Sequence, residues 1–108
     1  MTWKITYFDE TVEKAIEEWP ANMSAKYLKM VDLIEEFGPR QLGSNMTKAM
    51  GEGLFEIRIK ASEGIGRAFY CYMVREEIVV LHSIIKKTQK TPKKELEIAR
   101  KRMKKVTL

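Results

Sequence analysis

Apolar residues recur along this chain with two spacings, which separate helical from strand-forming stretches. Alternation of apolar and polar residues over 3–7 predicts a short first strand. Helical spacing then predicts one helix that Asp9 can cap and Pro20 ends, and a second over about 23–37. Because only a few residues join these helices, we expect them to pair as a hairpin.

The pattern changes after Pro39. Residues 40–53 contain Gly, Ser and Asn and are predicted to form a loop. Short turns then separate three apolar-rich segments that are typical of strands, at 54–60, 67–74 and 78–86. Pro92 can open a last helix, which has a thin apolar edge and is otherwise basic.

These elements predict the α+β class within a single domain over residues 1–108. We expect a small antiparallel β-sheet with the N-terminal helical hairpin packed on one face, and a C-terminal helix. The apolar side chains should face the helices. The other face should carry Glu56, Arg58 and Arg67, partly open to solvent.

Positive charge is concentrated at the C-terminal end. The net charge is +5, yet residues 82–108 alone hold ten Lys or Arg against two Glu. Such a segment favours a polyanionic partner, such as a nucleic acid, a ribosome, a membrane surface or an acidic protein.

The remaining composition narrows the setting. Cys71 is the only cysteine, so an internal disulfide is impossible, which suits a reducing compartment. The start leads into no apolar signal core and no run is long enough to span a membrane, so we expect a cytoplasmic protein with no membrane partner. One His and one Cys make a poor metal site, and we expect neither metal nor cofactor.

The candidate chemistry lies on the predicted sheet. Glu56, Arg58 and Lys60 share one face by strand parity, and Arg67 opens the next strand across a turn, so the two arginines can converge. Paired guanidiniums suit a phosphodiester and the charge that builds on phosphorus during cleavage. The alternative is that these residues form only an exposed polar face with Glu–Arg ion pairs and no functional site.

Three further strand residues each have two interpretations. His82 lies in a very apolar strand, either as a general acid or base or as a structural residue with a satisfied hydrogen bond. Tyr70 can stack on an RNA base or pack in the core. Cys71 fits a small buried hydrophobe better than a nucleophile.

A dense basic run follows the last strand, from Lys86 to Lys94. It should bind phosphates through charge, or else form a solvated turn and helix face. The lysines that we assign to RNA or ribosome binding, with Lys60 of the sheet, are Lys86, Lys87, Lys90, Lys93 and Lys94. The basic stretch 100–105 either extends this surface or ends the last helix.

Taken in order, several of these segments resemble a known family, the HigB-type, phage Gp49-like toxins of the RelE/ParE superfamily. The similarity covers residues 53–103. It rests on Gly-Leu-Phe-Glu-Ile-Arg at 53–58, Arg-Ala-Phe-Tyr at 67–70, Leu-His at 81–82 and Lys-Lys-Thr-Gln-Lys-Thr-Pro at 86–92. Phe55 departs from the usual Trp of the first segment.

The resemblance implies a RelE/ParE-like fold and a type II toxin–antitoxin system. It implies a helix-turn-helix antitoxin as partner, and a ribosome-dependent, metal-independent endoribonuclease that cuts mRNA (an mRNA interferase). In that reaction the 2′-hydroxyl of the RNA attacks the neighbouring phosphate, which leaves a 2′,3′-cyclic phosphate and a 5′-hydroxyl.

The resemblance also implies roles for particular residues. Arg67 matches a phosphate-stabilising arginine and Arg58 a second basic position. Glu56 stands where relatives vary between acid and base, and His82 matches a family histidine, so these four are the catalytic candidates. The same fold also serves ParE-like toxins that act on DNA gyrase and are not nucleases, which leaves a second hypothesis. A basic RNA-binding module without activity is a third.

Overall fold

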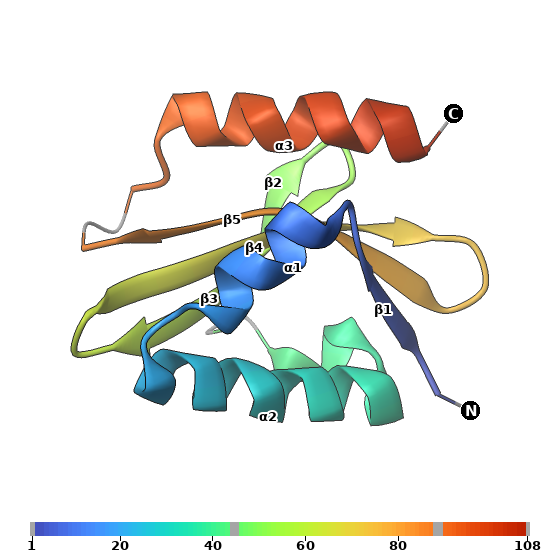
Figure 1. The fold of residues 1–108 in the computed structure, drawn as a ribbon. Coiled ribbons are helices and arrows are strands. Elements are labelled where there is room, and N and C mark those ends of the chain that lie inside the picture. The colour runs from blue at the N-terminus through green and yellow to red at the C-terminus, as the bar shows by residue number, and fades with distance from the viewer. Residues whose placement is uncertain (1, 44–45, 88–89, 108) are drawn as a thin grey trace.

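The computed structural model describes residues 2–43, 46–87 and 90–107, which form one five-stranded sheet with helices on both faces (Figure 1). The strands lie in the order β1-β5-β4-β3-β2. Their bounds are Lys4–Tyr7 for β1, Thr47–Gly51 for β2, Leu54–Ala61 for β3, Gly64–Met73 for β4 and Glu77–Lys86 for β5. The α+β class and four of the five strands are therefore as predicted.

The sheet is not wholly antiparallel, and that prediction is wrong. The pairs β2–β3, β3–β4 and β4–β5 are antiparallel, but β1 runs parallel to β5, with Lys4 opposite Glu77 and Tyr7 opposite Val80. Alternation along a strand determines which side chains share a face, and it says nothing of the direction of the neighbouring strand.

Strand β2 falls inside the stretch 40–53 that was predicted to be a loop, so that prediction is also wrong in part. Pro39–Leu42 forms a short 3-10 helix, η1, and Thr47–Gly51 then pairs with β3 at the edge of the sheet. Residues 47–51 have only a weak strand pattern of their own, and they form a strand because β3 supplies its hydrogen-bonding partners.

Helices α1 (Glu10–Glu17) and α2 (Ala21–Phe37) cover one face of the sheet. Asp9 caps α1 as predicted, because its side chain accepts a hydrogen bond from the Val12 amide at 3.0 Å. Gly38, at φ 90°, ends α2, and a Cβ there would lie 2.7 Å from the Trp3 ring.

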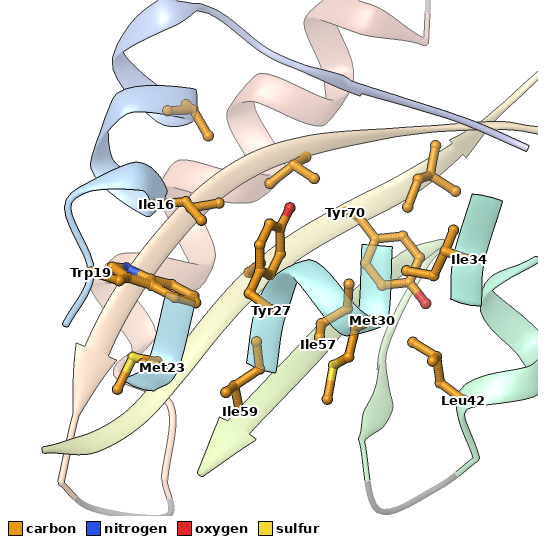
Figure 2. Packing of buried hydrophobic residues seen from close by; sticks show 14 residues of the cluster. Ile16, Trp19, Met23, Tyr27, Met30, Ile34, Leu42, Ile57, Ile59 and Tyr70 are labelled. Carbon is orange, nitrogen blue, oxygen red and sulfur yellow. The ribbon is translucent and has the colours of Figure 1, made fainter. Parts of the chain in front are cut away.

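The main core lies between these helices and the sheet. Figure 2 shows aromatic, sulfur-containing and branched side chains from α2 and the residues before it facing Ile57, Ile59 and Tyr70 of the sheet. The side chains of this core are buried. At its edge, the Tyr7 and Tyr27 hydroxyls share a 2.8 Å hydrogen bond. The α2 residues of this core are Met23, Tyr27, Met30 and Ile34.

Helix α3 (Lys93–Val106) covers the opposite face, which we had expected to be partly open to solvent (Figure 1). Ala99 packs on a second core, formed by Leu54, Phe69, Cys71, Val79 and Leu81. Two basic residues also bind the sheet, because Arg102 donates to the Leu81 carbonyl at 2.8 Å and Arg100 donates to the Met50 carbonyl at 2.7 Å. A thin apolar edge therefore suffices to seat α3.

Among the described residues, no helix is both long and apolar enough to cross a membrane.

At Gly66 of β4 the sheet closely approaches α2 and the residues just before it. A Cβ there would lie 2.6 Å from the Met23 sulfur and 2.9 Å from the Trp19 ring, and both side chains are buried. We expect Gly66→Ala to lower the free energy of unfolding by about 1–3 kcal/mol through overpacking, measured by urea unfolding. Ser62→Ala, in the exposed turn of the same hairpin, should change it little. Equal stability of the two variants would contradict this packing.

Candidate active site

The two candidate arginines lie directly opposite each other on β3 and β4. The register pairs Arg58 with Arg67, and it pairs Glu56 with Phe69 two residues away. Opposed residues of an antiparallel pair project to the same face, so all four face α3. The predicted convergence of Arg58 and Arg67 is confirmed.

A β-bulge in β5 brings His82 to the same face. The register shifts so that Phe69 pairs with His82 while Tyr70 pairs with Val80, which leaves Leu81 as the extra residue. His82 stacks on Phe69 with ring centroids 6.1 Å apart, and its Nε2 lies 2.7 Å from a carboxylate oxygen of Glu95 in the first turn of α3. His82 thus helps to hold the beginning of α3 against the sheet.

Glu56 is the centre of a buried polar network. Its side chain is fully buried, and one carboxylate oxygen accepts a hydrogen bond from the Arg58 Nε. The other accepts from the Thr91 hydroxyl at 2.7 Å, and that hydroxyl accepts in turn from the Arg67 guanidinium at 2.8 Å. A buried carboxylate demands such donors, because an uncompensated charge in the interior is very unfavourable.

Burial of this network corrects our prediction that Glu56 and Arg67 lie partly open to solvent. Both are 0% exposed, whereas the Arg58 side chain keeps 15% of its surface exposed. Burial lowers the pKa of the Arg67 guanidinium from its usual range; the nearby Glu56 opposes this effect and Arg58 adds to it. The physical reason is that Thr91, just before α3, closes over the two strands.

Tyr70 does not belong to this site, and its assignment to RNA binding is wrong. It lies on the opposite face of the sheet, beneath α2, with 1% of its surface exposed (Figure 2). Its ring stacks on Phe55 at 5.5 Å, and burial raises the pKa of its hydroxyl. The bulge that re-aims His82 leaves Tyr70 in the core.

The lysines assigned to RNA binding are all exposed. Ile65 pairs with Lys60 on one side and with Lys86 on the other, so the two lysines flank it in one row of the sheet. This row lies two residues beyond that of Arg58 and Arg67 and shares their face. Lys87 and Lys90 border Thr88 and Gln89, which lie outside the described residues, and Lys93 and Lys94 begin α3.

The described residues contain no group of three or more His, Cys, Asp or Glu side chains placed to share a metal ion. The charged donors on the site are arginine and lysine side chains. What the arrangement offers chemically is a cationic surface whose most accessible guanidinium, Arg58, is oriented by a buried carboxylate.

The model of one protein family matches residues 14–104, which is most of the chain; its description reads phage-derived protein Gp49-like. The chain belongs to this Gp49-like family. The family resemblance noted in the sequence is thereby confirmed.

Solved structures show the fold of this Gp49-like chain. A free double arginine-to-alanine mutant of the Escherichia coli toxin RelE superposes with a TM-score of 0.62 at 12% identity, over 98% of this chain and 99% of that one. The archaeal RelE in its complex with RelB, from Pyrococcus horikoshii, gives 0.55 at 17% identity, over 79% and 96%. No curated protein sequence matches significantly. The RelE-like fold is therefore as predicted.

Sequence reasoning missed two residues of this candidate site, Thr91 and Glu95. Thr91 stood within the basic run and was not distinguished from its neighbours. The one signal for it was its position before Pro92, where a polar side chain can reach back to the sheet as the helix begins. Glu95 stood among lysines, and only the bulge in β5 brings His82 to it.

Removing the Thr91 hydroxyl should weaken this network. We expect Thr91→Val to lower the free energy of unfolding by about 1–3 kcal/mol, because the isosteric side chain can neither donate to Glu56 nor accept from Arg67. Thr91→Ser should retain most of that stability in urea unfolding. Thr107→Val, which removes an exposed hydroxyl bonded to the Met103 carbonyl, serves as the control. Equal loss in Thr91→Val and Thr91→Ser would show that the methyl group matters instead.

Cys71 is a buried hydrophobe, as predicted, with 2% of its surface exposed. Burial raises the pKa of its thiol to about 11, so the reactive thiolate is scarce below that pH. At pH 8 we expect Ellman's reagent to modify the native chain at least ~100-fold more slowly than the urea-unfolded chain. A Val74→Cys, Cys71→Ala variant, with its thiol at an exposed turn, should react at once. Fast modification of the native Cys71 would contradict its burial.

Proposed function

We propose that this chain is the toxin of a type II toxin–antitoxin system and that it cleaves mRNA on the ribosome as a metal-independent endoribonuclease. Two kinds of support combine here. The fold is that of RelE, a protein described as a toxin and solved in complex with RelB. The site is a cationic surface on the face of the sheet near the beginning of α3.

The observation that carries the proposal is the alignment of Arg58 and Arg67 across β3 and β4, with Lys60 and Lys86 in a neighbouring row. Arg58, Lys60 and Lys86 sit on hydrogen-bonded strands and are accessible, so an RNA backbone would meet positions that need little reorganisation, while buried Arg67 supports Arg58 from below. Arg58 is partly exposed and can donate to a phosphate oxygen, while the lysines attract the flanking phosphates.

Arg67 takes a different role in this proposal from the one expected from the sequence. Because it is fully buried and donates to Thr91, it acts as a positioning residue rather than as a phosphate ligand. Through Thr91 and Glu56 it fixes the carboxylate that orients Arg58. The RNA 2′-hydroxyl then loses its proton to water and attacks the neighbouring phosphorus, the P–O5′ bond breaks and the leaving 5′-oxygen takes a proton from water. Arg58 stabilises the negative charge that builds on the phosphate.

Glu56 and His82 fit the proton-transfer roles less well. Both Glu56 oxygens already accept hydrogen bonds, and its carboxylate has no exposed surface. His82 is 17% exposed but lies two strands away from Glu56, roughly 10 Å at ordinary strand spacing. We therefore assign both to the support of the site, His82 by fastening α3 through Glu95.

A protein antitoxin completes the proposal. The RelE of Pyrococcus horikoshii was solved bound to RelB, and an acidic partner protein would complement the exposed cationic face of this chain. We propose a helix-turn-helix antitoxin, in line with the family resemblance.

The deciding experiment uses translating ribosomes with an end-labelled message. We expect the wild-type chain to create new 5′-hydroxyl ends within codons, and Arg58→Gln to slow cleavage at least ~100-fold. Glutamine can still donate to Glu56, so the variant should fold, as a matching urea unfolding curve would show. Arg75→Asn removes an arginine from an exposed turn at positive φ, which asparagine tolerates, and should cut normally.

Two results would overturn the proposal. The first is a message that stays intact in the ribosome assay although expression of the same folded chain arrests cell growth. If the chain then inhibits DNA supercoiling by gyrase, it belongs with the gyrase-directed toxins. The second is full cleavage by Arg58→Gln, which would remove the residue on which the mechanism depends.

A further inference from the structure

An apolar groove of about 370 Å³ lies between α2 and β3, beside the candidate active site. Its floor consists of Met30, Leu33, Met46 and Ile59. Leu33 and Met46 are 43% and 38% exposed, which is unusual for large apolar side chains that sit together. The groove opens just before β2 begins, where the Arg58 amide donates to the Met46 carbonyl.

The rim of the groove is entirely cationic. The charged residues that line it are Lys26, Lys29, Arg58 and Lys60, with no Asp or Glu among its lining residues. Lys26 is also held in place, because its ammonium donates to the Lys60 carbonyl at 2.8 Å. An occupant must therefore combine aliphatic side chains for the floor with negative charge for the rim.

We infer that this groove binds an acidic amphipathic segment of a partner protein, which, given the proposed function, is the antitoxin. Aliphatic anchors of the segment fill the floor between Met30 and Ile59, and methionine walls adapt to such anchors. Carboxylates beside the anchors pair with Lys26, Lys29 and Lys60. Arg58 borders the groove through β3 while its guanidinium is held on the other face by Glu56, so the bound segment lies beside the candidate active site and hinders access to it.

Two other occupants fit the groove less well. An RNA base has polar edges that would stay unsatisfied on this apolar floor, and none of the described residues that line the groove has an aromatic ring for stacking. A second copy of the chain, docked through the same face, would bring the lysines of both rims together, and their repulsion opposes association.

The test measures binding of the full chain to a fluorescent, helix-forming synthetic peptide. The peptide carries leucine on one face and glutamate beside it, and a scrambled peptide of equal composition has its leucines on all sides. We expect the first to bind and the second to bind at least ~10-fold more weakly, with amide shifts in NMR confined to α2 and the end of β3.

Matched variants locate the binding. Leu33→Asp should weaken binding at least ~10-fold, whereas Leu28→Asp, on the same helix but outside the groove and 58% exposed, should leave it unchanged. Reversing the rim with Lys26→Glu and Lys29→Glu should have a similar effect and abolish the salt dependence of binding, while Lys14→Glu on α1 should do neither.

Equal effects of Leu33→Asp and Leu28→Asp, or equal binding of the two peptides, would overturn the inference. So would a single-stranded RNA oligonucleotide that binds in the same place and is equally sensitive to Leu33→Asp. The ribosome assay separates this inference from the proposed function. Peptide binding in the groove without any mRNA cleavage refutes the function alone, and cleavage without peptide binding refutes the groove alone. With both present, the peptide should slow cleavage by the wild type and not by Leu33→Asp.

Discussion

The burial of one carboxylate, that of Glu56, is the constraint around which the functional face is built. A negative charge between a sheet and a helix is tolerated only when donors surround it, and here they come from three separate segments. Arg58 comes from the same strand, Thr91 from the residues before α3, and Arg67, through Thr91, from β4. The carboxylate thus fixes the direction of the exposed guanidinium and the seat of the last helix together.

The two faces of the sheet differ in composition, because one is an apolar core and the other carries the charged residues of the candidate site. The face under α1 and α2 is an apolar core with aromatic contacts, and it holds Tyr70 firmly. The face under α3 mixes a smaller core with the cationic rows. The bulge at Leu81 lets one strand serve both purposes, because it keeps Val80 in the first core while turning His82 toward Glu95. The main apolar core and the candidate site thereby lie on opposite faces of one sheet.

Much of this fold could be predicted from local sequence patterns, and the predictions that failed did so for physical reasons. Strand β3 alternates cleanly, so the shared face of Glu56 and Arg58 could be predicted, as could the convergence of Arg58 and Arg67 across a tight hairpin. The parallel pairing of β1 and the edge strand β2 could not, since both depend on partners distant in the sequence.

Burial of the site was missed for a similar reason. Helix α3 has few apolar residues, and its arginines looked like solvent-facing charges, yet Arg100 and Arg102 bind carbonyl groups of the sheet. With α3 seated, Thr91 covers Arg67. Some of the basic residues of α3 thus attach the helix to the sheet. Composition alone does not distinguish this structural role from binding to a polyanion.

The parallel pair of β1 and β5 joins the start of the chain to a strand made near its end, with Thr6 donating to Glu77 across the sheet. During synthesis, β1 must therefore wait for about seventy further residues before it finds its neighbour, and Thr91 emerges later still. The growing polypeptide consequently passes through the ribosome with its cationic face unassembled, so a surface whose proposed target is the translating ribosome forms only after β5 and Thr91 have left it.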